Sequence, residues 1–156
     1  VWAGNVGSAL ADEEIWTKIV EESRLIADMA QEKGISVSYE YHGNTLTDTT
    51  DSALRLLQEV NHPNIYTYWQ PPIDLDFDDR INGLRVVKPW LSHIHAFHWV
   101  NREKLELANG ENEWRRYLDE VSKVPGDRYV MLEFVRNDLP EQFIEDAEIL
   151  KKLVDI

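Results

Sequence analysis

Hydrophobic positions along the 156-residue chain follow two alternating patterns. Stretches with apolar side chains every three or four residues are typical of amphipathic helices, and short runs rich in Val, Ile, Tyr and Trp are typical of buried strands. Helices are expected over about residues 12–33, 49–60, 81–87, 114–121 and 140–154, and strands over residues 35–42, 64–70, 91–99 and 128–135. The alternation predicts about four βα units around a parallel sheet, preceded by a helix, in an α/β protein.

Helix boundaries agree with this pattern. Gly34 ends the first helix, Thr49 or one of the two residues before it can cap the second, and Pro140 suits the first turn of the last. The strand at 91–99 is expected to lead into a polar loop before the fourth helix. The last helix is expected to face inward through four positions, namely Phe143, Ala147, Leu150, and Leu153 or Val154.

Composition narrows the chemistry. The chain has no cysteine, so a metal would be bound by carboxylate, imidazole or amide groups. With 16 basic and 29 acidic residues, its net charge of −13 argues against nucleic acid as a partner. No apolar run approaches the ~18–20 residues of a membrane span, and we expect a cytoplasmic protein with no membrane partner.

Polar side chains with metal-binding potential fall near the ends of the predicted strands. They are Glu40 and His42, Gln70, His95 and His98, and Glu133. Active sites of parallel α/β folds lie at the carboxyl ends of the strands. Because Glu133 lies within the apolar run YVMLEFV, it needs a cation, a proton or hydrogen bonds. A divalent metal would satisfy Glu40, His95 and Glu133 together.

Several of these segments resemble one known family. The stretches VWAG, VSYEYHGNTLTDT, IHAFHW, YVMLEFV and FIEDAEILKKL look like the later half of the xylose isomerase-like TIM barrel superfamily, which includes sugar phosphate isomerases/epimerases and an AP endonuclease family 2-like branch. The resemblance implies a (β/α)8 barrel fold, of which residues 1–156, as a single domain, supply strands five to eight and the preceding helix. Two such half barrels could close as a homodimer, or an N-terminal half is missing. The start in mid-motif favours a piece of a longer protein.

The resemblance also implies a site and a reaction. Glu40, Gln70, His95 and Glu133 would bind Mn, Mg, Co or Zn, with Gln70 standing where the family has Asp. Glu40 and Glu133 would transfer the proton in a sugar or sugar-phosphate isomerase/epimerase that works through an enediolate. The alternatives are another metal-assisted lyase or hydrolase, and a non-catalytic remnant.

Substrate contacts are expected from five further residues, His42, Trp69, His98, Trp99 and Arg102. Each also has a structural interpretation. His42 could cap its own loop, the aromatic residues could pack inside the barrel, and Arg102 could be a solvated loop residue. The acidic run at Asp74, Asp76, Asp78 and Asp79 is interpreted as helix capping.

Overall fold

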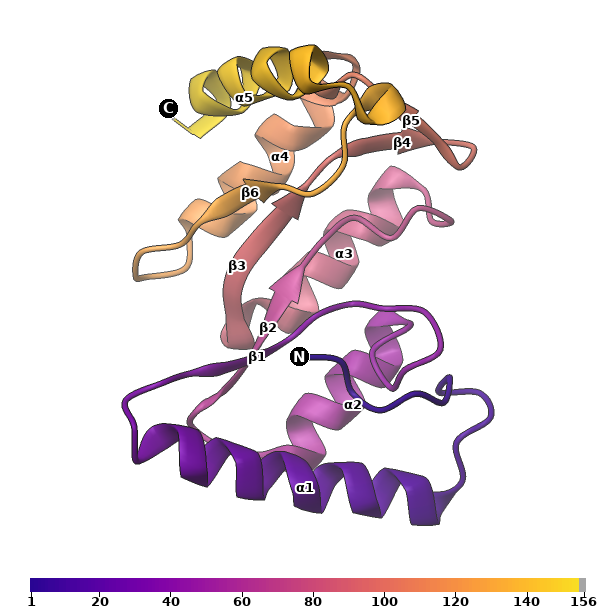
Figure 1. Cartoon of the computed structure of the whole chain (residues 1–156), viewed down its shortest axis with the longest axis vertical. Coiled ribbons are helices and arrows are strands. Elements are labelled where there is room, and N and C mark those ends of the chain that lie inside the picture. The colour runs from indigo at the N-terminus through magenta and orange to yellow at the C-terminus, as the bar shows by residue number, and fades with distance from the viewer. Residues whose placement is uncertain (155–156) are drawn as a thin grey trace. The chain divides into compact units, whose positions relative to one another are not determined.

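The computed structural model describes residues 1–154 and confirms the alternation of strands and helices (Figure 1). The chain divides into two compact units. Unit 1 contains residues 1–69 and 89–92, and unit 2 contains residues 70–88 and, of the described residues, 93–154. Among the described residues, no helix is long and apolar enough to cross a membrane.

Unit 1 is built from α1 (Glu13–Gln31), β1 (Val37–Tyr39), α2 (Thr50–Val60) and β2 (Ile65–Trp69). The two strands are parallel, with Val37 opposite Ile65. Thr49 begins α2 with a capping box, in which its side chain and that of Ser52 each accept from the other residue's backbone N–H. β3 (Leu91–Ala96) also begins in this unit, where Ser92 Oγ donates to Thr67 O at 3.0 Å.

The N-terminal residues lie along β1. The Val1 amino group donates to Ser38 O at 2.7 Å, and the Glu40 backbone N–H donates to Val1 O at 3.0 Å. A further bond runs from Leu46 N to Ala3 O at 3.0 Å. These bonds fix the backbone on which Glu40 is carried.

Unit 2 contains α3 (Phe77–Val87), α4 (Glu111–Ser122), β6 (Val130–Leu132) and α5 (Pro140–Val154). It also holds the short helices η2 (Leu107–Gly110) and η3 (Arg136–Asp138), while η1 (Lys88–Trp90) leads into β3. β3 pairs in parallel with β6, placing Ala96 opposite Leu132. α5 packs against both α4 and β6, and fully buried core side chains include Leu84, Trp114 and Leu153.

A β-hairpin replaces the polar loop expected after β3. The predicted strand 91–99 ends at Ala96, and β4 (His98–Val100) then pairs antiparallel with β5 (Glu103–Leu105). The turn residues Asn101 and Arg102 have φ values of 50° and 66°. A two-residue hairpin turn with both central residues in the left-handed region matches the twist of its strands.

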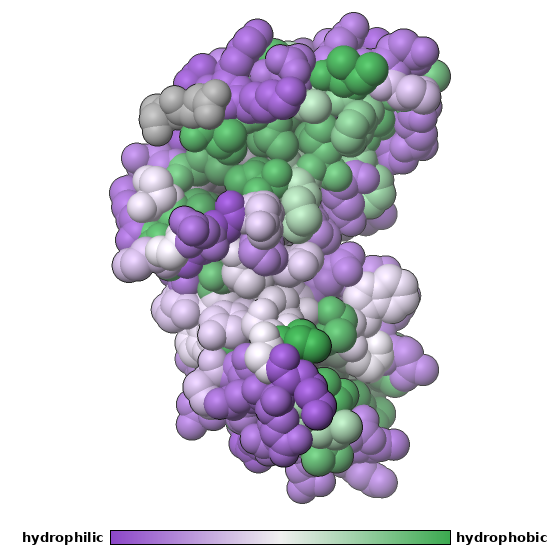
Figure 2. Space-filling model, turned by 60° about the vertical axis from the view of Figure 1, so that its left-hand side comes forward, coloured by the Kyte–Doolittle hydropathy of each residue, from purple (hydrophilic) through white to green (hydrophobic). Residues whose placement is uncertain are grey.

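α5 faces the core through a different set of side chains from the one expected. Leu150 and Leu153 are buried as predicted, but Phe143 is 51% exposed, and Gln142 and Asp146 are buried instead. Other large apolar side chains are exposed as well, among them Leu25, Ile26 and Met29 of α1. Figure 2 shows hydrophobic patches between hydrophilic ones on one face of the molecule.

Candidate metal centre at the strand ends

All four predicted metal ligands lie at the carboxyl ends of parallel strands. Glu40 directly follows β1, Gln70 follows β2 and Glu133 follows β6, while His95 is the penultimate residue of β3. The register of β3 and β6 explains part of this arrangement. The Glu133 backbone N–H continues the ladder by donating to Ala96 O at 3.1 Å, one residue beyond His95.

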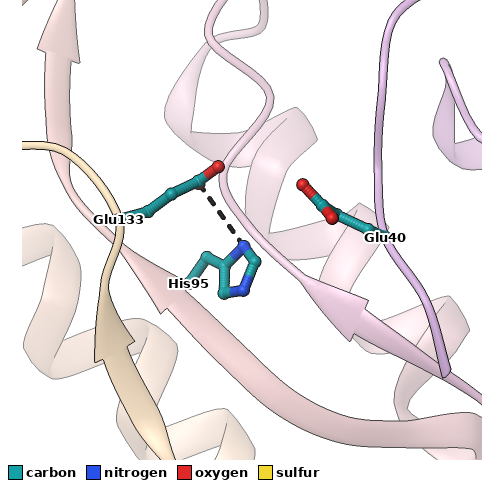
Figure 3. A group of neighbouring side chains, drawn as sticks. All are labelled: Glu40, His95 and Glu133. Atoms are coloured by element: carbon teal, nitrogen blue, oxygen red, sulfur yellow. Dashed lines mark ion pairs between the residues drawn. The ribbon is translucent and has the colours of Figure 1, made fainter. Parts of the chain in front are cut away.

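Within unit 2, three of these side chains converge. His95 Nδ1 lies 3.2 Å from Gln70 Oε1 and 3.4 Å from Glu133 Oε2, the latter contact being the dashed ion pair of Figure 3. The side chains of His95 and Glu133 are only 14% and 21% exposed. Gln70 Oε1 and Glu133 Oε2 thus both face His95 Nδ1 in a partly desolvated site.

The geometry of this cluster fits a divalent cation. Ligand bonds of about 2.1 Å place neighbouring ligand atoms about 3.0 Å apart in octahedral and about 3.4 Å apart in tetrahedral coordination. Both distances from His95 Nδ1 are close to that range. In the part of the chain that the structure describes, the buried Glu133 Oε2 has no hydrogen-bond partner. A buried carboxylate oxygen without a donor is costly, and a cation would remove that cost.

Glu40 is held by a contact that sequence reasoning missed. Trp2 Nε1 donates to Glu40 Oε2 at 3.2 Å, and the Trp2 ring stacks on His42 with ring centroids 3.9 Å apart. Trp2 therefore orients two predicted site residues of unit 1. The sequence pointed to the VWAG segment only through the family resemblance. No pattern in the sequence indicates that Trp2 contacts residues 40–42. Glu40 is drawn with the unit 2 residues in Figure 3, and its side chain is half-buried.

His42 is half-buried, and its Nδ1 lies 2.8 Å from Gly43 O. This contact supports the alternative that His42 stabilises its own loop, and it uses Nδ1 and not Nε2. Trp69, at the end of β2, is fully buried.

His98 occupies a separate cluster in unit 2. It is buried under Gly110, where an added Cβ would lie 2.3 Å from His98 Nδ1. It lines a small cavity together with Arg80 and Glu113. Burial lowers the pKa of His98, and nearby Glu113 opposes this shift more strongly than Arg80 adds to it.

The remaining two predicted substrate residues lie on the hairpin. Trp99 is half-buried and packs edge-on against Phe97 and Phe134. Arg102 is 71% exposed in the turn and donates to Asp74 at 2.8 Å. Asp76 caps α3 by accepting from Asp79 N, in agreement with the capping interpretation of the acidic run.

The chain belongs to the xylose isomerase-like TIM barrel family, whose model matches residues 1–153. This confirms the family resemblance and the TIM-barrel type of α/β fold. The proportion of the barrel supplied by this chain stays a prediction.

Relatives of the chain include dehydratases. A 3-dehydroshikimate dehydratase of Bacillus anthracis is 30% identical over 131 residues, which cover 80% of this chain and 45% of the relative. An inosose dehydratase of Clostridium perfringens is 23% identical, covering 78% and 41% of the two chains. The chain thus spans less than half the length of these two curated relatives.

Solved structures agree on the fold. The crystal structure of a probable 3-DHS dehydratase from B. anthracis has a TM-score of 0.75 and 25% identity, covering 96% of this chain and 60% of the other. A D-psicose 3-epimerase from Clostridium cellulolyticum H10 has a TM-score of 0.67 and 14% identity, covering 99% and 60%. At that identity the epimerase supports the fold alone. The fold is therefore shared by proteins named as a dehydratase and as an epimerase.

Proposed function

We propose that the protein is a metal-dependent lyase that removes water from a cyclic polyol ketone. Glu40, Gln70, His95 and Glu133 are the proposed ligands of a divalent cation, either Mn, Mg, Co or Zn. The observation that carries the proposal is the convergence of Gln70 and Glu133 on His95, where the buried Glu133 Oε2 makes no hydrogen bond within the described residues. The dehydratases among the relatives support the reaction class.

A cation bound by these ligands would polarise the substrate carbonyl and stabilise negative charge on its oxygen. The chain itself supplies the proton transfers. One glutamate, Glu40 or Glu133, takes the proton from the carbon beside the carbonyl, and the C–H electron pair becomes the new C=C bond. The C–O bond of the β-hydroxyl breaks, and a proton delivered by the other glutamate completes the leaving water. One proton is taken and one is given, so the overall reaction is ketone to enone plus water.

Glu133 is the better candidate for the base, because its buried Oε2 makes no hydrogen bond within the described residues and contacts His95 Nδ1 at 3.4 Å. Glu40 Oε2 already accepts from Trp2, which orients the side chain. His42, held against the Trp2 ring, is proposed to hydrogen-bond a substrate hydroxyl through Nε2.

A sugar or sugar-phosphate isomerase/epimerase is the second candidate. It begins with the same proton abstraction and differs only in returning the proton to carbon. The same two proposed ligands, Glu40 and Glu133, would serve it, because one can remove the proton and the other can return it.

Metal content tests the proposed centre first. The wild-type chain, Glu133→Gln and the control Glu148→Gln would be equilibrated with Mn²⁺, desalted and measured by elemental mass spectrometry. Glu148 is exposed on α5, where it forms an ion pair with the exposed Lys151 at 2.6 Å. We expect about one metal per chain in the wild type and the control, and a loss in Glu133→Gln. Equal metal content in all three proteins would refute the centre.

The reaction is tested with three substrates on the Mn²⁺-loaded chain. Loss of water from 3-dehydroshikimate or inosose creates a conjugated product that is followed by ultraviolet absorbance, while epimerisation of a ketose is followed by NMR in D₂O. We expect dehydration, abolished by EDTA and by Glu133→Gln. Deuterium uptake into a ketose without dehydration would favour the second candidate, and metal binding without any turnover would refute both reactions.

A further inference from the structure

We propose that Lys104 on the β4–β5 hairpin recognises a carboxylate of the substrate, so that the preferred substrate is a cyclic keto acid and not a neutral keto polyol. This inference rests on the proposed function and adds a substrate class to it. The hairpin was not expected from the sequence, and Lys104 is not among the predicted site residues.

Lys104 lies in unit 2 against an aromatic ring whose residue follows Glu133 in the sequence. Its Nζ lies 5.2 Å from the centroid of Phe134, the residue directly after Glu133. It also lies 5.9 Å from the ring of Trp99, which is its cross-strand partner in the hairpin. The two rings contact each other with centroids 5.3 Å apart. The ammonium group is therefore positioned by aromatic rings on the two segments that follow Glu133 and His95.

The surroundings of Lys104 suit an anionic ligand. The Lys104 side chain is 28% exposed, so it is partly desolvated but accessible. A cation against an aromatic face is stabilised by the ring, and its N–H groups can still donate hydrogen bonds to a ligand. Trp99 Nε1 is buried and has no hydrogen-bond partner among the described residues. A ligand oxygen beside Lys104 would supply an acceptor near this indole.

The present partner of Lys104 is exchangeable. Its Nζ contacts Asp138 Oδ1 at 2.5 Å, but the Asp138 side chain is 70% exposed in η3. Ion pairs with solvent-exposed groups contribute little to stability, so a substrate carboxylate can replace Asp138 at small cost. Arg102 is less suitable, because it is 71% exposed at the tip of the turn and bound to Asp74.

Binding of two probes of opposite character tests the inference. Shikimate is a cyclic polyol with a carboxylate, and myo-inositol is a cyclic polyol without one. Their affinities for the full Mn²⁺-loaded chain would be measured by NMR titration for the wild type, Lys104→Met, Lys104→Arg and Lys151→Met. Lys151→Met is the matched control, because it removes a lysine from another ion pair with an exposed acidic residue, 2.6 Å from Glu148.

We expect Lys104→Met to weaken shikimate binding about 10- to 100-fold, the range for losing a charge-assisted hydrogen bond. Binding of myo-inositol should stay within about twofold, since a neutral ligand loses no such bond. Lys104→Arg should restore most of the shikimate affinity, and Lys151→Met should change neither.

The opposite results overturn the inference. Equal losses for both probes would assign Lys104 a purely structural role, and no loss for either would remove it from the site. If the wild type and Lys104→Met bind the metal and both probes equally well, the inference fails while the proposed function stands. A wild-type chain that binds neither metal nor probes would overturn both.

Discussion

Glu120 is expected to be a large pH-dependent source of stability in unit 2. Its side chain is 9% exposed, and it accepts from Arg85 at 2.9 Å and from Lys88 at 2.8 Å, with Lys123 at 3.2 Å. Hydrogen bonds from Lys88 and then Arg85 lower the pKa of Glu120 from 4.5 to about 2, against the opposing effect of burial. These bonds join α4 to α3 and to the start of η1.

The magnitude follows from linkage. A lowering by about 2.5 pKa units corresponds to ~3.4 kcal/mol, at 1.36 kcal/mol per unit. Arg85 and Lys123 are about half exposed, so water screens part of this interaction. We therefore expect Glu120→Gln to lower the free energy of unfolding by about 2 kcal/mol at pH 7. Because the folded pKa is depressed, the contribution is complete above about pH 4.5 and is lost as the pH falls through about 2.

Urea unfolding followed by tryptophan fluorescence measures this difference. Wild type and Glu120→Gln would be compared at pH 7, 4.5, 3 and 2, so that effects of other carboxylates cancel in the difference. Glu148→Gln is the control, because Glu148 and its ion-pair partner Lys151 are both exposed and the change should be much smaller. A wild-type advantage that is absent at pH 7, or that does not shrink between pH 4.5 and 2, would refute the reasoning.

Three other predictions concern ligand charge and packing. Gln70→Asp should raise Mn²⁺ affinity about tenfold or more by adding a charged ligand, and calorimetry showing no gain would exclude position 70 from the centre. Gly110→Ala should lower the free energy of unfolding by about 1–3 kcal/mol, because its Cβ meets His98 at 2.3 Å, whereas Gly43→Ala has open space and should be nearly neutral in the same assay. Asp146→Ala should cost about 2–4 kcal/mol because two buried donors lose their acceptor, and a thermal melt equal to wild type would contradict this.

The sequence predicted the order of strands and helices because each helix carries a clear apolar period and each strand an apolar run. It also located the candidate ligands, since chain direction alone places Glu40, Gln70 and Glu133 where parallel strands end. The contact of Trp2 with Glu40 and His42 could not be predicted, because it depends on the first residues lying along β1.

Two local features were missed for identifiable reasons. The hairpin turn has Asn101 followed by Arg102 where turns of this kind favour glycine, so its sequence signal is weak. In α5, Asp146 Oδ1 accepts from Leu107 N and from Gln142 Nε2, each at 3.0 Å. Because this acceptor must be buried, α5 turns Gln142 and Asp146 toward the core and leaves Phe143 half exposed. The spacing of apolar residues alone cannot reveal this orientation of the helix.

Gln70 stands where the resemblance to the family implies an aspartate, and the geometry around His95 shows what this difference does. An aspartate there would place two carboxylates, positions 70 and 133, against His95 Nδ1 without a cation, whereas the neutral amide reduces that repulsion. The structure has Gln70 Oε1 and Glu133 Oε2 within 3.4 Å of the same nitrogen, an arrangement that a single N–H on His95 can partly satisfy. The amide therefore stabilises the metal-free cluster and lowers the charge that attracts a cation. It follows that affinity at this centre should depend on the glutamates, while Gln70 contributes mainly orientation.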